Sequence, residues 1–192
     1  MATILGLDVD PKTVRAVVLT PALRRSEITM YASVDIAPAD TDEGRLENRH
    51  AAMRTVMSRL VKPPDRIITE LSGDEVSIRK VSLPSKAAKR IGELLPFELE
   101  GQVPFDPAEA VLDYQPISAS GGALQLFAAV APKARVAAHL AAMREVGVDP
   151  REVAIGAVAL DGLVPLLPEL ATPGPHCVID IHHEGTDVCI LD

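Results

Sequence analysis

Two strand–turn–strand patterns, at residues 4–19 and 177–191, frame this chain and constrain its fold more than any other feature. In each, an apolar, β-branched run reaches an aspartate, Asp8 or Asp180, and a polar turn leads into a second apolar run. Alternation of this kind on both sides of a turn predicts an antiparallel hairpin. Residues 28–36 alternate in the same way, so a third strand is expected beside the first pair.

The chain between the two hairpins alternates strand and helix patterns, which is typical of α/β proteins. The patterns predict strands at 66–71, 76–83, 111–117, 123–131 and 153–158, and helices at 42–61, 86–100, 133–146 and 161–170. Thr41 or Asp42 is expected to cap the first helix. His50 lies on the apolar stripe of that helix, where a partly buried core histidine is expected. Pro96 is expected to kink or break the second helix.

Composition argues against several classes of function. Aromatic residues make up 3% of the 192 residues, and the net charge is -8 with no basic stripe, so nucleic acid is not an expected partner. The most apolar stretch, residues 153–171, contains Asp161, Glu169 and two prolines, so no membrane insertion by this chain is expected. Cys177 and Cys189 predict two small buried hydrophobes in a reducing, cytoplasmic compartment.

The turns of the two hairpins are candidate phosphate loops. In a clamp of this kind, a carboxylate positions a metal ion or a water, and small residues let backbone N–H groups approach phosphates. The candidate cofactor-binding residues are, in the first loop, Asp8, Lys12 and Thr13 and, in the second, Asp180, Gly185 and Thr186. An ordinary hairpin is the alternative interpretation of either loop taken alone.

The pair of loops resembles the phosphate loops of the actin-like ATPase superfamily, whose usual forms are D-x-G-[ST]-x-[ST] and D-x-G-x-G-T. The middle of the chain is similar to a narrower family, the cytoplasmic part of type IV pilus assembly protein PilM and general secretion pathway protein L. The resembling segments are RKVSLP at 79–84, ELLPFELEGQVPF at 93–105 and DYQ at 113–115. Together with the hairpins, the resemblance covers nearly the whole chain.

This resemblance implies an α/β fold, namely an actin-like (ribonuclease H-like) lobe with an inserted small α/β subdomain, truncated before the second lobe is complete. The implied parts are a first actin-like subdomain at residues 1–73, the inserted subdomain at 74–158, and a linker helix with the start of the second lobe at 159–192. It also implies a platform role among other inner-membrane components of a secretion or pilus machine and its assembly ATPase.

Both loops depart from the pattern of the superfamily. Asp10 and Pro11 stand where the family has Gly followed by Ser or Thr, which adds a negative charge and removes an N–H donor. His182 stands where the second loop has Gly, so a side chain occupies space that the backbone would need. The loops are therefore interpreted as degenerate nucleotide loops with no catalytic residue, no metal site and no cofactor. ATP with Mg is the alternative.

The function that the resemblance implies is that of a non-enzymatic cytoplasmic scaffold of the type II secretion platform. It would dock the secretion ATPase, and the full-length protein would be anchored in the bacterial inner membrane or peripheral to it. A PilM-like, ATP-binding adaptor of type IV pilus assembly, which binds the N-terminal tail of a membrane partner, is the alternative. An active actin-like kinase or ATPase is a third hypothesis, which the degenerate loops disfavour.

An acidic, partly apolar segment in the middle of the chain supplies candidate residues for binding a partner protein. These residues are Phe97, Glu98, Glu100, Phe105 and Asp106. A solvated loop over the edge of the core is the alternative interpretation of this segment. The open edge of the second hairpin is a further candidate surface, through which a homodimer would form.

Overall fold

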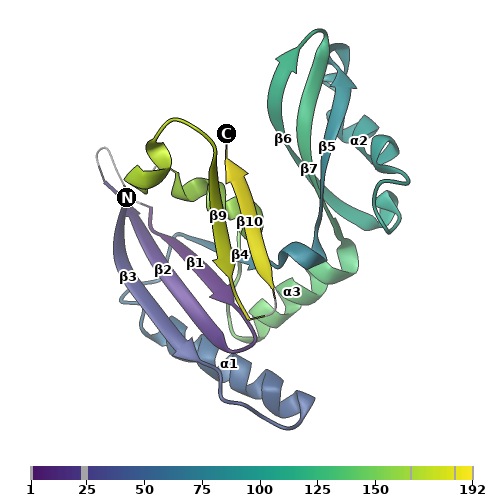
Figure 1. The fold of residues 1–192 in the computed structure, drawn as a ribbon. Helices are drawn as coiled ribbons and strands as arrows, with labels where there is room; N and C mark the ends of the chain where they lie inside the picture. Colours follow the sequence, from purple (N-terminus) through teal and green to yellow (C-terminus); the bar gives the residue numbers. More distant parts are fainter. Residues whose placement is uncertain (1, 23–25, 165, 184, 192) are drawn as a thin grey trace. The chain divides into compact units, whose positions relative to one another are not determined.

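The structure is a computed structural model and describes residues 2–22, 26–164, 166–183 and 185–191. Its chain forms two compact units (Figure 1). The first unit contains Met1–Leu71 and Leu140–Asp192, and the second contains Ser72–His139. The second unit is therefore an insertion in the first, and the boundary on its C-terminal side falls within helix α3 (Lys133–Glu145).

A five-stranded mixed sheet forms the centre of the first unit, in the order β3-β2-β1-β4-β8. The three N-terminal strands are antiparallel, as the sequence predicts, whereas β4 pairs in parallel with β1 and β8 pairs in parallel with β4. The strands are β1 (Ile4–Val9), β2 (Thr13–Pro21), β3 (Ser26–Asp35), β4 (Arg66–Leu71) and β8 (Glu152–Ile155).

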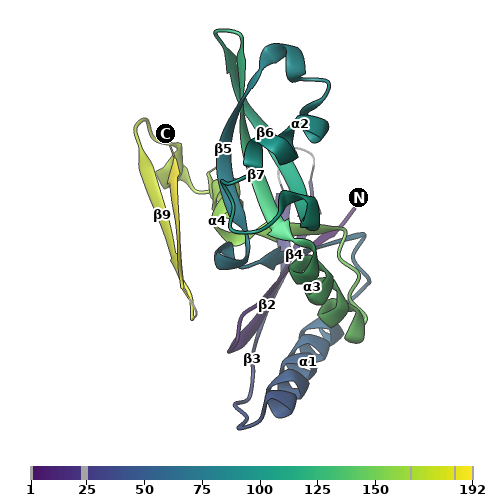
Figure 2. The ribbon, with the colours of Figure 1, turned by 90° about the vertical axis from the view of Figure 1, so that its right-hand side faces the viewer.

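Helix α1 (Asp42–Ser58) packs against β2 and β3 of this sheet (Figure 2). Thr41 caps the helix, as predicted, because its hydroxyl accepts the backbone N–H of Gly44 at 3.1 Å. His50 is buried on the helix stripe, which confirms the prediction of a core histidine. The core of this unit contains Leu5, Leu7, Val14, Ala16, Val18, Ala32, Ala52, Met53, Val56, Met143 and Val148.

A three-stranded antiparallel sheet forms the centre of the second unit, with β7 between β5 and β6. The β6–β7 turn contains Gly121 and Gly122 at φ values of 61° and 80°, which glycine adopts without strain. Helix α2 (Ile91–Leu99) shares the core of this unit with β5 and β7. The strands are β5 (Ser77–Pro84), β6 (Ala110–Ser120) and β7 (Ala123–Pro132).

The helix predicted at residues 86–100 is wrong in its first part. Ser85–Ala87 forms a short 3-10 turn, and α2 begins only at Ile91. Pro96 lies inside α2 without ending it, so the predicted break does not occur. Ile91, Leu95 and Leu99 recur every four residues and are all buried. Their burial offsets the backbone hydrogen bond that the proline removes.

The chain after the inserted unit also differs from the prediction. The strand predicted at 153–158 is the shorter β8, and its pairing with β4 places it in the first unit, so the second unit ends at His139 rather than at residue 158. In place of one helix at 161–170, the structure has helix α4 and two 3-10 turns, at Gly156–Ala159, Leu160–Leu163 and Pro168–Ala171. The local pattern does not reveal the long-range pairing that decides the place of β8.

The second hairpin consists of β9 (His176–Ile181) and β10 (Thr186–Leu191), which form a separate two-stranded sheet in the first unit. In its register, Asp180 lies directly opposite Asp187. Cys177 is exposed and Cys189 is partly exposed, so the prediction of two buried cysteines is wrong. The exposed face of the hairpin is apolar and carries Ile179, Ile181, Val188 and Ile190.

Candidate functional site

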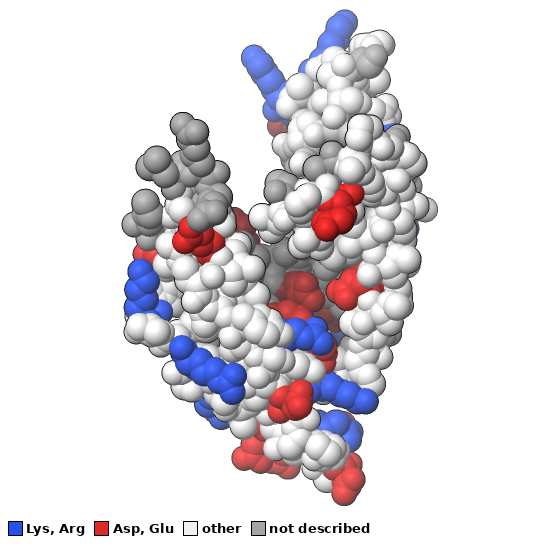
Figure 3. Space-filling view, turned by 60° about the vertical axis from the view of Figure 1, so that its left-hand side comes forward, with Lys and Arg blue, Asp and Glu red and all other residues white. Residues whose placement is uncertain are grey.

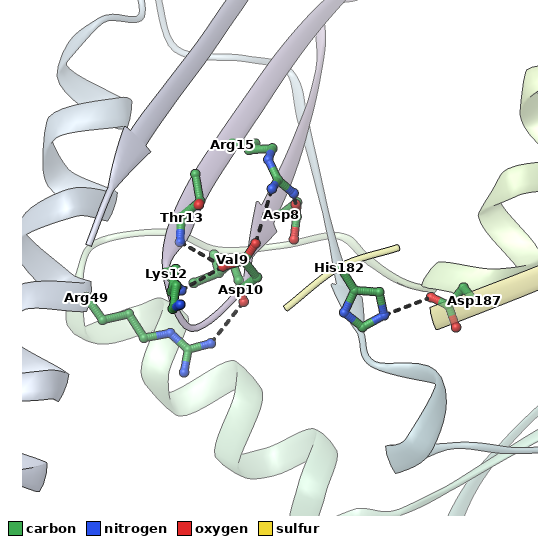
Figure 4. Close-up of polar contacts among 9 residues, drawn as sticks. All are labelled: Asp8, Val9, Asp10, Lys12, Thr13, Arg15, Arg49, His182 and Asp187. Carbon is green, nitrogen blue, oxygen red and sulfur yellow. Dashed lines mark hydrogen bonds and ion pairs between the residues drawn. The ribbon is translucent and has the colours of Figure 1, made fainter. Parts of the chain in front are cut away.

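The loop between β1 and β2 is closed by one of its own side chains (Figure 4). The Oδ1 atom of Asp10 accepts the backbone N–H groups of Lys12 and Thr13, both at 2.7 Å. In a phosphate loop, backbone N–H groups of this kind point at the bound anion. Here a carboxylate of the chain already accepts them, so Asp10 stands in the place that a phosphate oxygen would take.

Arg15, on β2, joins this loop to the end of β1. Its guanidinium donates to Asp8 Oδ2 at 2.9 Å and lies 3.3 Å from Asp10 Oδ2. Burial raises the pKa of Asp8 above its ordinary value, and the charge of Arg15 opposes that rise. Arg15 is absent from the residues that the sequence predicts. Its position directly opposite Asp8 in the β1–β2 register is the signal that identifies it.

Glu70, on β4, is a further carboxyl group at this site and is not among the residues predicted from the sequence. Leu7 of β1 pairs with Thr69 of the parallel strand β4, which brings Glu70 level with Asp8. Burial is the main cause that raises the pKa of Glu70 to about 7, and the negative charges of Asp8, Asp187 and Asp180 contribute. Only the parallel pairing of these two strands could have revealed Glu70, because nothing local marks it.

The second hairpin contributes Asp187 to the same cluster. A Cβ atom on Gly156 would lie 2.8 Å from Asp187 Oδ2 and 3.7 Å from Glu70 Oε2, so both carboxylates approach one point of the backbone. His182 Nε2 lies 3.8 Å from Asp187 Oδ2 (Figure 4). The ring of His182 packs over Gly185, where a Cβ atom would lie 3.3 Å from its Cε1 atom.

The structure gathers only some of the predicted cofactor residues around the acidic cluster. Asp8 belongs to it, and Asp180 acts on it through its charge. The backbone N–H groups of Lys12 and Thr13 donate hydrogen bonds to the Asp10 carboxylate. The remaining two positions, Gly185 and Thr186, are exposed in the second hairpin.

The backbone N–H groups of the first loop are already occupied by a carboxylate of the chain. An anion that binds the same N–H groups would have to displace the carboxylate of Asp10 and would lie close to the carboxyl groups of Asp8 and Glu70. In the described part of the chain, no three His, Cys, Asp or Glu side chains are arranged to hold a metal ion. A cavity of about 960 Å³ adjoins the loop beside Pro11, Lys12 and Arg49, but its lining does not include the acidic cluster.

The predicted partner-binding residues separate into two groups. Phe97, Glu98 and Glu100 are exposed around the end of α2, and Phe97 is 69% exposed. Phe105 is half-buried and packs against the core of the second unit. Asp106 accepts the N–H of Ala108 at 2.9 Å and caps a 3-10 turn. The structure therefore uses the last two side chains within the unit and leaves the first three at the surface.

Charge is dispersed over the face that Figure 3 draws. Lys and Arg side chains on this face lie among acidic and uncharged surface. Among the described residues on this face, no continuous positive stripe follows a groove, which is the arrangement that binds a nucleic-acid backbone. None of the helices in the described ranges is long and apolar enough to cross a membrane.

Comparison with known proteins identifies the fold. No protein-family model matches the chain, and no curated protein sequence matches it. Among solved structures, a chain of the "PilM-PilN type IV pilus biogenesis complex" matches 98% of this chain with a TM-score of 0.80 and 26% sequence identity. The chain has an actin-like fold. It spans 57% of the matched chain in the pilus complex.

A second solved structure has a similar fold. The cytoplasmic domain of EpsL, an inner-membrane component of the type II secretion system of Vibrio cholerae, matches 100% of this chain and 71% of its own chain. The TM-score is 0.58 and the sequence identity is 15%, so this likeness shows the fold. The resemblance to the PilM and general secretion pathway protein L family is thereby confirmed by two solved structures.

Proposed function

We propose that this chain is a non-enzymatic scaffold in the cytoplasmic part of an inner-membrane platform that assembles type II secretion machines or type IV pili. It docks the assembly ATPase and does not use nucleotide itself. The likeness to solved components of both machines supports the platform role. The whole protein is held at the bacterial inner membrane, where such a platform works.

The observation that carries the nucleotide-free part of this proposal is the position of Asp10. Its carboxylate accepts two backbone N–H groups and lies 3.3 Å from the guanidinium of Arg15. Hydrogen bonds to a charged group contribute about 1.5–3 kcal/mol each, so a phosphate must replace a well-satisfied anion in order to bind here. Two further carboxyl groups, those of Asp8 and Glu70, lie next to that place, where burial raises the pKa of both.

Calorimetric titration with Mg-ATP tests this part of the proposal. The wild-type chain is expected to give no heat of binding and no ATP turnover. Asp10→Gly frees both N–H groups and removes the charge, whereas Asp10→Asn keeps the acceptor oxygen and serves as the matched control. Gain of phosphate binding by the glycine variant but not by the asparagine variant would identify Asp10 as the block. Micromolar ATP binding by the wild-type chain would contradict the proposal.

A PilM-like, ATP-binding adaptor of pilus assembly is the second candidate function. The observation that favours it is the stronger match to the pilus complex, with a TM-score of 0.80 against 0.58 for the secretion protein. This candidate predicts ATP binding by the wild-type chain and binding of the N-terminal tail of a membrane partner. The same titration therefore separates the two candidates.

Docking of the assembly ATPase is tested with purified proteins. The scaffold proposal predicts a complex between this chain and the N-terminal domain of the assembly ATPase, formed equally well with and without ATP. The cytoplasmic tail of a PilN-like platform protein is the second probe. Complex formation with that tail alone, and only in the presence of ATP, would favour the adaptor and count against the scaffold.

A further inference from the structure

We infer that the exposed end of helix α2, formed by Phe97, Glu98 and Glu100, docks a basic surface of the partner protein that carries an apolar pocket for the Phe97 ring. This inference rests on the proposed function, because it names the surface by which the scaffold holds its partner. Of the five predicted partner-binding residues, only these three are assigned to the docking surface. Phe105 packs on the core of the second unit, and Asp106 caps a 3-10 turn.

The buried side of α2 fixes the direction of the Phe97 side chain. Ile91, Leu95 and Leu99 lie one above another on the helix and are each at most 5% exposed. Phe97 lies between the last two in sequence and is therefore turned away from the core, with 69% of its surface exposed. A large aromatic ring that a helix holds in water contributes favourable binding free energy when a pocket of a partner protein buries it.

The carboxylates beside this ring form no ion pair with Lys, Arg or His among the described residues. Glu98 and Glu100 are exposed and take part in none of the ion pairs described for this unit. Two cations of the same unit donate to backbone carbonyls instead. Arg79 donates to Gln102 at 2.7 Å, and Lys133 donates to Ala108 at 2.7 Å. The charge next to Phe97 is therefore free to meet a cation from outside.

The position of these carboxylates on the helix strengthens the argument. Glu98 lies in the last turn of α2 and Glu100 is its C-terminal cap residue. The C-terminal end of a helix carries partial negative charge and is stabilised by cations, yet the last turn of α2 contains no basic residue. Two acids at this end therefore oppose helix stability, and a basic partner would relieve the repulsion.

Charge also selects among the classes of partner. A second copy of this chain would bring its own glutamates to the surface, and the net charge of -8 disfavours such an approach. An anionic lipid surface would repel the same carboxylates. A protein surface with Lys or Arg around an apolar pocket matches both the ring and the charge.

Binding of purified probes to the 192-residue chain tests the inference. The probes are the N-terminal domain of the assembly ATPase and the cytoplasmic tail of a PilN-like platform protein. Phe97→Ala and the double variant Glu98→Gln/Glu100→Gln are each expected to weaken binding about tenfold or more. The matched controls are Phe127→Ala, at a phenylalanine that is 50% exposed on β7, and Glu43→Gln/Glu47→Gln on α1. Both controls are expected to bind like the wild type.

A second measurement separates loss of the docking surface from loss of folding. The double glutamine variant is expected to raise the melting temperature of the free chain, because it removes two charges from the wrong end of a helix. Weaker binding by a more stable protein cannot come from misfolding. Higher salt is expected to weaken wild-type binding more than binding by the double variant.

Each outcome bears on a different claim. If the wild type and both test variants bind a probe equally well, the inference is overturned and the proposed function stands. If the two controls weaken binding as much as the test variants do, the location of the surface is wrong. If the wild type binds neither probe, the proposed function and the inference fall together.

Discussion

The Nε2 atom of His50 on α1 lies 3.5 Å from Oε2 of Glu145 on α3, within ion-pair reach but with no hydrogen bond between them. His50 is buried, whereas the side chain of Glu145 is 60% exposed. The two partners therefore sit in different surroundings, one in the core and one in solvent. A buried ring nitrogen without a hydrogen bond is a cost to the fold rather than a support.

His50→Leu tests this interpretation. The substitution removes the unsatisfied nitrogen and keeps an apolar side chain in the core, so the free energy of unfolding is expected to stay unchanged or rise by up to about 1 kcal/mol. Urea unfolding at neutral pH measures the change. Met53→Ala, at a fully buried neighbour on the same helix, is the contrasting control and is expected to cost about 2–5 kcal/mol. A clear loss of stability in His50→Leu would show that the Glu145 contact stabilises the fold.

Asp10→Ala is expected to lower the free energy of unfolding by about 1–2 kcal/mol, because two backbone N–H groups lose their acceptor. Chemical denaturation measures this loss. Asp35→Ala, at an exposed aspartate near the end of β3, is the matched control and should change stability by less than about 0.5 kcal/mol. Equal effects of the two substitutions would mean that the Asp10 contacts do not hold the loop closed.

Glu70 gives the stability of the first unit a specific dependence on pH. Its pKa is raised from 4.5 to about 7 in the folded protein, so the folded state holds a proton that the unfolded state releases at lower pH. The stability that this proton supplies is fully present below about pH 4.5 and is lost as pH rises through 7. Glu70 is partly exposed, so the loss is expected to be on the order of 1 kcal/mol after solvent screening.

Glu70→Gln removes this titration and isolates its effect. The difference in unfolding free energy between variant and wild type is expected to grow in favour of the variant from pH 5 to pH 8, as Glu70 loses its proton. Urea unfolding across that range measures the difference. Glu47→Gln on the exposed face of α1 is the control and should give a difference that does not change with pH. A flat difference for Glu70→Gln would contradict the raised pKa.

Gly156→Ala tests the approach of the second hairpin to the acidic cluster. The new Cβ atom would lie 2.8 Å from Asp187 Oδ2, so the carboxylate must move away. We expect a loss of about 1 kcal/mol in the wild-type background and little loss in an Asp187→Ala background. A double-mutant cycle measured by urea unfolding gives the coupling. Equal losses in both backgrounds would show that Asp187 does not approach Gly156.

Local patterns predict much of this fold. The turn after Asp8, the alternation of residues 28–36 and the polar boundaries of β4 are all contained in short windows of sequence. So is the cap at Thr41, because a hydroxyl that accepts an N–H three residues later needs no distant partner. Family resemblance added the insertion, whose core strands β5, β6 and β7 then followed the predicted ranges closely.

The parts that the sequence could not predict depend on contacts between distant segments. Glu70 joins the site through parallel pairing with β1, and β8 joins the sheet through pairing with β4. Phe97 and Phe105 look alike in sequence, yet one is exposed and the other packs on the core, since only the fold decides which way each ring points. Asp10 departs from the family pattern, but only the loop geometry shows what its carboxylate does instead.

The cross-strand pair of Asp180 and Asp187 has a consequence for local opening of the chain. Like charges directly opposite one another weaken a two-stranded sheet, and the exposed apolar face of this hairpin adds little to hold it. We therefore expect this hairpin to open at a lower free energy than the pair of strands β1 and β2. Amide hydrogens in β9 and β10 should exchange with deuterium faster than those in β1 and β2. Added salt should slow that exchange, because it screens the repulsion that loosens the pair.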